Sequence, residues 1–227
     1  MPRHRRATLS RSPAAAALSL LLALAALTSC APRRVVGPPF DGVAADLEIL
    51  ALMLQGLDAC GVRGAQLDIG HVGVYRALAQ AAGLSGEAEH RLFGALQAKD
   101  ASAVAALTAD LPNDLRSAFV ALPQLYGDRG VLAEARTRLP ALPAVAAALD
   151  TLDALDSGLG GAEAAYDLAE LRGYGYHSGI VFAAYTAGRS RAIAQGGRYD
   201  EVGKVFGRAR PATGFSMDLR ELAAVGA

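Results

Sequence analysis

The chain has 227 residues, of which 52% are apolar, and its 22 basic and 22 acidic side chains give a formal net charge of zero. This total hides a division: residues 1–40 hold six arginines and no acid, whereas residues 41–227 hold 16 basic and 22 acidic side chains and carry −6. The acidic body argues against a nucleic-acid binder, whose affinity comes from cations that neutralise phosphates. The apolar content excludes wholesale disorder. Two cysteines cannot make a disulfide framework, and no residues have metal-ligand spacing, so we expect no metal. We also expect no cofactor.

Residues 1–40 have the layout of a bacterial export signal. A basic stretch precedes an apolar run from Ala14 to Leu27, which is too short to cross a bilayer as a helix but suits a signal-peptide core. The tetrad Leu27-Thr28-Ser29-Cys30 resembles a lipobox, in which the cysteine is lipidated after cleavage. Two interpretations stay open: an exported lipoprotein, or a leader created by a misplaced start or shifted frame in a GC-rich gene. We favour the artefactual leader and a cytoplasmic protein, with no membrane association unless the leader is genuine.

Residues 41–227 are expected to form one domain that begins with helices. Leucines at helical spacing predict a helix over 43–60, followed by a strand over 65–69 and a second helix over 72–82. His71, between this strand and helix, is interpreted as a structural histidine because no partner for it can be identified. An alanine- and leucine-rich segment over 86–155, punctuated by prolines, predicts several short helices. We interpret this segment as an inserted helical subdomain without catalytic residues.

The pattern changes to strands after Gly160. The expected strands are separated by glycine-containing turns and cover residues 166–171, 179–185, 191–194 and 212–217, with a short helix from about Asp218. Gly196-Gly197 is interpreted as a hairpin turn. Because short connections favour antiparallel pairing, the predicted fold class is α+β, with helices inserted before a small antiparallel sheet.

The candidate ligand-binding residues lie in a glycine-rich loop between two predicted strands: Arg172, Tyr174, Tyr176, His177, Ser178 and Gly179. An arginine in such a loop can hold a carboxylate through two parallel hydrogen bonds, and tyrosine rings can grip a small polar or aromatic ligand. Arg198 and Tyr199 are expected beside the same pocket. The combination favours a pocket for a small molecule such as an amino acid. The alternative is a twisted hairpin whose polar side chains merely face solvent.

Three stretches carry a resemblance to a known family. Residues 172–182, RGYGYHSGIVF, resemble the histidine-recognition segment of histidyl-tRNA synthetases, and residues 196–222, which end in GFSMDLREL, resemble the third motif that defines class II synthetases. The chain is more similar still to the synthetase-like regulatory subunits of ATP phosphoribosyltransferase, with LDIGHVGVYRAL at residues 67–78 as a further matching stretch. The resemblance covers residues 41–222 and implies a partial class II aminoacyl-tRNA synthetase-like fold.

Departures from the synthetase pattern decide between these two relatives. Synthetases end the third motif in Glu-Arg-Leu, with an arginine that contacts ATP, whereas this chain has Arg220-Glu221-Leu222. A carboxylate at that position would repel a triphosphate. The recognition loop has Gly175 and His177 where the synthetase pattern has aspartate and tyrosine. Amino-acid activation and tRNA charging are therefore disfavoured, although a histidine-activating enzyme fragment stays as an alternative.

The resemblance to the regulatory subunits implies a protein without catalytic residues of its own. Such a subunit assembles with the short-form catalytic subunit of ATP phosphoribosyltransferase into a hetero-oligomer and makes that enzyme sensitive to L-histidine, the effector. The family's first and second motifs would precede Asp41, where residues 1–40 show nothing similar. We therefore expect an N-terminally truncated copy, in which part of the pocket wall is replaced by the leader.

Overall fold

The computed structural model describes residues 42–225, and the predicted leader with its lipobox-like tetrad lies outside this range. The described residues belong to one compact unit. Its helices are α2 (Val43–Ala59), α3 (Val72–Ala81), α4 (Gly86–Gln97), α5 (Ala101–Leu107), α6 (Asn113–Ala121), α7 (Gly130–Arg138), α8 (Pro143–Gly158) and α9 (Leu219–Val225), with 3-10 turns η1 (Leu122–Gln124) and η2 (Val202–Phe206). Its strands are β1 (Gln66–His71), β2 (Tyr126–Gly127), β3 (Ala164–Asp167), β4 (Ile180–Tyr185), β5 (Ala194–Arg198) and β6 (Thr213–Met217).

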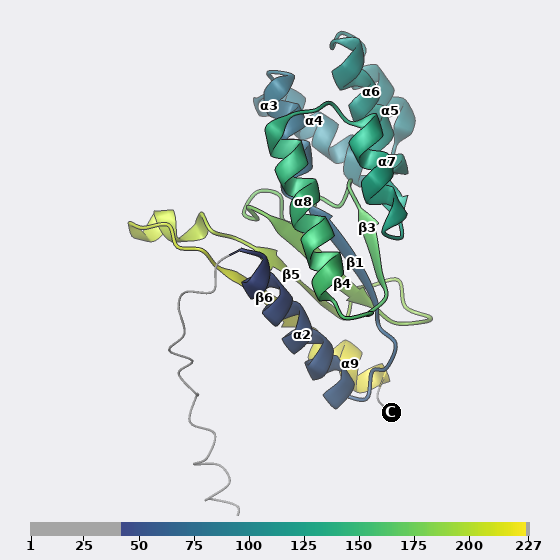
Figure 1. Ribbon diagram of the computed structural model, residues 1–227, viewed down its shortest axis with the longest axis vertical. Coiled ribbons are helices and arrows are strands. Elements are labelled where there is room, and N and C mark those ends of the chain that lie inside the picture. The colour runs from purple at the N-terminus through teal and green to yellow at the C-terminus, as the bar shows by residue number, and fades with distance from the viewer. Residues whose placement is uncertain (1–41, 226–227) are drawn as a thin grey trace, which may run out of the picture. The chain divides into compact units, whose positions relative to one another are not determined.

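The strands form one sheet in the order β2-β3-β1-β4-β5-β6 (Figure 1). Four of its five neighbouring pairs are antiparallel, but β1 and β3 run parallel, with Leu67 opposite Ala164. The α+β class is thus confirmed, and the expectation of a purely antiparallel sheet is wrong for this one pair. The parallel pairing has its cause in the long connection: α3 and the helical segment, α4 to α8, lie between β1 and β3 in the chain, and a long helical crossover returns the chain in the same direction.

The hydrophobic core lies between one face of this sheet and the helices. Leu67 and Ile69 of β1 are fully buried in the same cluster as Tyr75 of α3 and Leu149 of α8. The alternation along β1 sends Asp68 to the opposite face. The helix boundaries have local causes: the His71 side chain accepts a hydrogen bond from the backbone N–H of Gly73 and so caps α3. The structural interpretation of His71 is confirmed.

Two strand predictions are wrong. The strand predicted over 166–171 is β3, which ends at Asp167, because the Asp167 side chain accepts from the Ala169 N–H and turns the chain. The predicted strand over 191–194 and the predicted turn at Gly196-Gly197 are replaced by β5, which runs through both glycines. These glycines serve close packing: a Cβ at Gly196 would lie 2.2 Å from the carbonyl oxygen of Gly214, and one at Gly197 would lie 2.5 Å from that of Ile180.

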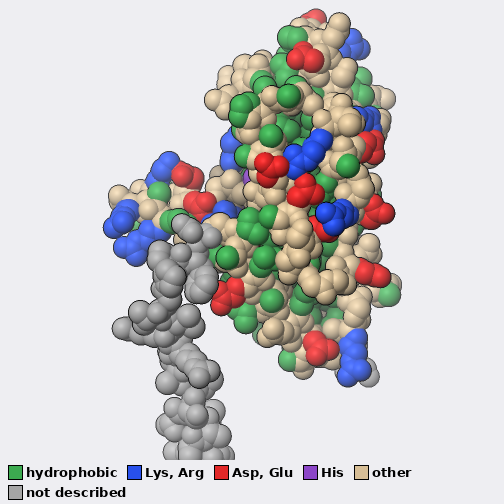
Figure 2. All heavy atoms as spheres, viewed as in Figure 1, with side chains coloured by type: hydrophobic (Ala, Val, Ile, Leu, Met, Phe, Trp, Pro, Cys, Tyr) green, Lys and Arg blue, Asp and Glu red, His purple; other side chains and the backbone are tan. Residues whose placement is uncertain are grey.

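The connection between β5 and β6 projects from the sheet (Figure 1). It contains η2, whose Val205 and Phe206 side chains are 85% and 87% exposed. Lys204, Arg208 and Arg210 are also exposed there, and Figure 2 shows basic side chains gathered at the end of this projection. The projection therefore presents apolar and basic side chains together.

Candidate functional site

The recognition loop, residues 172–178, is a compact turn rather than an open hairpin. The backbone N–H groups of Tyr176 and His177 both donate to the carbonyl oxygen of Gly173, at 2.9 and 2.8 Å. Gly173 has a φ of 64°, and a Cβ there would lie 2.5 Å from the Nδ1 atom of His177. Only glycine meets both demands without strain. The turn thus separates Tyr174, whose hydroxyl reaches Glu89 of α4, from Tyr176 and His177, which line a cavity on the other side of the loop.

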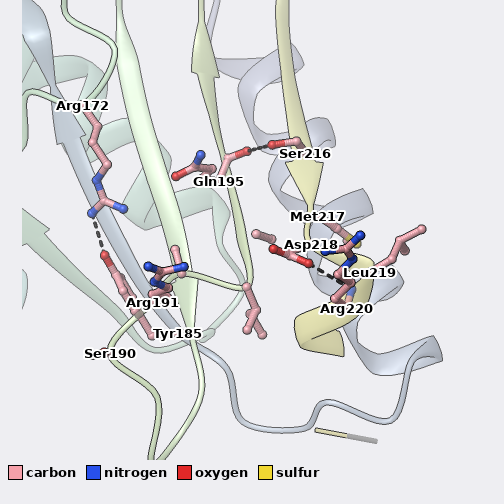
Figure 3. A pocket seen from close by; sticks show the side chains of 13 residues that line it. Arg172, Tyr185, Ser190, Arg191, Gln195, Ser216, Met217, Asp218, Leu219 and Arg220 are labelled. Carbon is pink, nitrogen blue, oxygen red and sulfur yellow. Dashed lines mark hydrogen bonds between the residues drawn. The ribbon is translucent and has the colours of Figure 1, made fainter. Parts of the chain in front are cut away.

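Arg172 is held by two neighbours on the open face of the sheet. Its guanidinium donates to both carboxylate oxygens of Glu170. It also donates to the hydroxyl of Tyr185 at 2.6 Å, as Figure 3 shows. The Arg172 side chain is 41% exposed, whereas that of Glu170 is 14% exposed. The guanidinium is therefore fixed in direction by Glu170 and Tyr185 while part of it stays accessible to a ligand.

His177 is buried beneath Tyr176. Its ring is 4.2 Å from that of Tyr176, and the residue is 6% exposed, whereas Tyr176 is 55% exposed. The Nδ1 atom lies 3.0 Å from the carbonyl oxygen of Arg172. Because a carbonyl can only accept, Nδ1 carries the proton and Nε2 of the neutral ring is an acceptor. Burial lowers the pKa of His177, which keeps the ring neutral near pH 7.

Arg172, Tyr176 and His177 line a cavity of about 170 Å³ beside the loop. Its walls come from the loop and from three strands: Glu170, Arg172, Gly173, Tyr176, His177, Val181, Phe182, Gln195, Gly196 and Ser216. A larger, open cavity of about 940 Å³ adjoins it and shares Arg172, Gln195 and Ser216 (Figure 3). The site is thus a small recess that opens into a broad groove along β4, β5 and β6.

A row of three glycines and one valine crosses the sheet, and its valine, Val181, lines the recess. Gly70, Val181, Gly197 and Gly214 lie opposite one another on four neighbouring strands. A Cβ at Gly70 would lie 2.8 Å from the Cβ of Glu170, and one at Gly197 would lie 2.8 Å from Nε2 of His177. Because these glycines have no side chains, Glu170 and His177 can pack directly against the backbone of the sheet.

The predicted site residues divide into two groups. Arg172, Tyr176 and His177 line the recess, whereas five others contribute to the surrounding framework. Ser178 accepts a hydrogen bond from the Asp200 N–H at 2.9 Å, and Gly179 gives room to the Arg198 side chain, which a Cβ would approach to 2.9 Å. The Tyr199 ring lies 6.5 Å from that of His177.

Arg198 and Tyr174 point away from the recess. The guanidinium of Arg198 is 10% exposed and donates to both oxygens of Asp46 in α2, at 3.1 and 2.9 Å. It also donates to Asp200 and to the Gly42 carbonyl. The Tyr174 hydroxyl donates to Glu89 of α4 at 2.7 Å. Arg198 fastens α2 to the sheet, and Tyr174 belongs to an aromatic cluster with the helices.

Sequence reasoning missed Glu170, Gln195 and Ser216 as lining residues. Asp68, Ala183, Gln195 and Ser216 form a second row across the sheet, next to the glycine row. Asp68 is notable in this row, because its Oδ1 atom is buried and has no hydrogen-bond partner in the described part of the chain. Burial and the nearby charge of Asp167 raise the pKa of Asp68. Polar residues at alternate positions of otherwise apolar strands were the available signal for this row.

Residues 42–225 contain no group of three or more histidine, cysteine, aspartate or glutamate residues placed to hold a metal ion. Nor does a helix in this range have the length and apolar character needed to cross a membrane.

The family of the chain follows from a match over most of its length. A family model described as histidyl-tRNA synthetase matches residues 40–222. The chain belongs to the histidyl-tRNA synthetase family. The family's class II synthetase-like fold includes the recognition loop, β5, β6 and most of α9 within the matched range. The resemblance of residues 41–222 to this family is confirmed.

Curated proteins similar to this chain include regulatory subunits of ATP phosphoribosyltransferase. The chain is 78% identical over 185 residues to the ATP phosphoribosyltransferase regulatory subunit of Thiobacillus denitrificans, which covers 82% of this chain and 58% of the relative. It is 54% identical to the regulatory subunit of Chromobacterium violaceum, over 81% of this chain and 48% of the relative. The chain therefore spans about half the length of the curated relatives it matches.

Solved structures of the family share the fold. A protein of Bacillus halodurans, described as an ATP phosphoribosyltransferase regulatory subunit/histidyl-tRNA synthetase, superposes with a TM-score of 0.72 at 27% identity, over 82% of this chain and 50% of that one. An ATP phosphoribosyltransferase complex of Thermotoga maritima matches with a TM-score of 0.60 at 18% identity, over 79% of this chain and 62% of that one. At that identity the second likeness concerns the fold alone.

The end of the third family motif has a distinctive arrangement in this chain. Glu221, at the position where the synthetase pattern has its nucleotide-contacting arginine, forms an ion pair with Arg189 of the β4–β5 connection. Its charge is therefore partly neutralised, and the repulsion of a triphosphate expected from the sequence is weaker than an unpaired carboxylate would give. Arg220, the preceding residue, lines the broad groove (Figure 3). The exchange of arginine and glutamate thus replaces the cation with a paired carboxylate.

Proposed function

We propose that this protein is a non-catalytic regulatory subunit of ATP phosphoribosyltransferase, which acts in the first step of L-histidine biosynthesis. The observation that carries this proposal is the 78% identity to the regulatory subunit of Thiobacillus denitrificans. The partner is a short-form catalytic subunit, with which the protein forms a hetero-oligomer. The mixed sheet and its recognition loop supply the part that responds to the effector.

The effector is L-histidine, bound in the recess beside the recognition loop. A volume of about 170 Å³ is below the roughly 300–1,000 Å³ of pockets that bind drug-sized ligands, and therefore suits one amino acid. Arg172 and Glu170 offer a cation and an anion side by side, which complement the carboxylate and ammonium of a free amino acid. The Tyr176 and His177 rings can pack against an imidazole.

Feedback inhibition follows if L-histidine binds one state of the assembly better than another. A ligand shifts an equilibrium only by its difference in affinity for the two states. The subunit then transmits a coupling free energy to the catalytic partner and takes no part in the chemistry. The Ser178, Gly179, Arg198 and Tyr199 positions support the recess without contacting its interior, and Tyr174 fixes the loop from the helical side.

The competing function is histidine activation by a synthetase-like enzyme. The residue at position 221 argues against it, because this chain has a glutamate where the synthetase pattern has the arginine that contacts ATP. The two functions are separated by adding the purified chain to a short-form catalytic subunit and following ATP- and phosphoribosyl-pyrophosphate-dependent product formation. We expect activation of that enzyme and no histidine-dependent ATP–pyrophosphate exchange. Exchange without activation would overturn the proposal.

The same proposal places the protein in the cytoplasm, where the substrates of the catalytic partner are found. The exported-lipoprotein alternative requires lipidation at Cys30, in the part of the chain that precedes the described residues. Radiolabelled palmitate and cell fractionation test it. We expect an unlabelled protein in the soluble fraction, and a labelled protein in the membrane fraction would contradict the cytoplasmic placement.

A further inference from the structure

Tyr174 connects the recognition loop to α4, the first helix of the helical segment. Its hydroxyl donates to a carboxylate oxygen of Glu89 at 2.7 Å, and its ring lies edge-on to Tyr75 at 5.1 Å and 5.3 Å from that of Phe93. The Tyr75 hydroxyl donates to the backbone carbonyl of Glu89 at 3.0 Å. Two tyrosines from different elements therefore converge on the same residue of α4.

Arg76 of α3 holds the loop at a second point. Its guanidinium donates to the carbonyl oxygen of His177 at 3.0 Å and lies 5.1 Å from the centre of the Tyr174 ring. Arg76 is exposed and lines neither the recess nor the groove. Arg76 therefore contacts both Tyr174 and His177, the residues at the two ends of the turn.

The turn between these anchors is short and internally hydrogen-bonded. Gly173 accepts from the N–H groups of both Tyr176 and His177, so a displacement of Tyr174 is passed to the two aromatic residues of the recess. The hydrogen bond from Tyr174 to Glu89 has a charged acceptor and lies in a half-buried setting, where such bonds are strong. Burial, together with the bond to Glu89, raises the pKa of Tyr174 to about 12, so the hydroxyl remains a donor across the physiological range.

We propose that Glu89 and Arg76 are positioning residues for the effector recess: they hold the recognition loop through Tyr174 and the His177 carbonyl, and thereby couple effector binding to the packing of α4. This inference rests on the proposed function of the recess. Coupling is reciprocal, so a ligand that is bound more tightly when α4 is in place must also stabilise α4. The helical segment contributes no lining residue to the recess, but the stability of α4 would then depend on whether the recess is occupied.

The first test measures L-histidine affinity by calorimetry in the full chain. Tyr174→Phe keeps the ring and removes the hydrogen bond, so we expect about tenfold weaker binding, as for loss of a bond to a charged acceptor. Glu89→Ala should weaken binding equally, and the double variant no further, because both remove one interaction. Glu89→Gln keeps an acceptor and should remain within about threefold of the wild type. Tyr126→Phe, at an exposed tyrosine, is the matched control and should bind normally.

The second test follows amide hydrogen exchange in α4, which a purely structural role of Glu89 would leave insensitive to the ligand. In the wild type, saturating L-histidine should slow exchange in the first turns of α4. In Tyr174→Phe at saturating ligand, this slowing should be lost, although the recess is filled. Wild-type affinity in Tyr174→Phe with α4 still protected would overturn the coupling and leave the proposed function standing. Failure of the wild type to bind L-histidine would overturn both.

Discussion

Replacement of Arg198 by methionine should destabilise the fold by about 3–5 kcal/mol at pH 7, the usual cost of removing one partner of a buried ion pair. The carboxylate of Asp46 is 2% exposed and receives two hydrogen bonds from Arg198. Methionine fills much of the same space but leaves this carboxylate without a cation. α2 would then lose its polar attachment to β5.

The loss of stability caused by Arg198→Met should depend on pH. Burial raises the pKa of Asp46 above its ordinary value even with Arg198 present, because the lowering by Arg198 is smaller. Without Arg198 the folded-state pKa of Asp46 rises further, so the folded variant binds a proton that the unfolded chain does not. Its stability is therefore recovered as the pH falls, and the penalty should be smaller at pH 5 than at pH 7.

Urea denaturation followed by circular dichroism measures the penalty at both pH values. Arg136→Met is the matched control, since Arg136 pairs with Asp150 and Asp153 at the surface, and such a change should cost at most about 1 kcal/mol. Asp46→Asn should cost less than Arg198→Met, because an amide still accepts from the guanidinium. A penalty for Arg198→Met below about 1 kcal/mol, or one equal at pH 5 and pH 7, would refute the reasoning.

Three further outcomes follow from the structure. Burial lowers the pKa of His71 from 6.5 to about 4. The stability that this residue contributes is therefore complete above pH 6.5, and up to about 3 kcal/mol of it is lost as the pH falls toward 4. His71→Asn keeps an acceptor that can cap α3 and should flatten the pH dependence of the urea unfolding midpoint in this range. Gly196→Ala should cost about 2 kcal/mol or more by crowding β6, whereas Gly94→Ala, in open space on α4, should be neutral or stabilising in thermal unfolding. Phe206→Ser should leave the melting temperature unchanged, because the side chain is 87% exposed, and a large drop would show that it is buried in solution.

Regular periodicity made the helices and central strands predictable. α2, α3, β4, β6 and α9 lie within two residues of their predicted positions, because their apolar residues repeat at helical or strand spacing and glycines mark their ends. The parallel pairing of β1 with β3 depends on where a long crossover returns, which local spacing does not encode. The glycine pair of β5 predicts a turn from sequence alone, because glycines that allow a close approach of strands look the same in a sequence as glycines that adopt a positive φ.

The segment that forms the candidate site was predictable from the sequence, but the directions in which its side chains point were not. The glycines and polar residues of 172–179 mark a loop, yet Tyr174 and Tyr176, two residues apart, lie on different sides of it. Gly173 turns the backbone between them, and the partner that draws Tyr174 away is Glu89, 85 residues earlier in the chain. Arg198 similarly meets Asp46 across 152 residues. Pairings at such separations are set by the tertiary fold.

The central claim is tested most directly by L-histidine inhibition of the reconstituted ATP phosphoribosyltransferase. The short-form catalytic subunit is assayed with the wild-type chain and with Arg172→Met, after both chains have been shown to fold. The account predicts that both chains activate the enzyme, and that L-histidine inhibits only the assembly with wild type. Equal inhibition of the two assemblies would contradict the placement of the effector in the recess, and the absence of activation by the wild type would contradict the regulatory function itself.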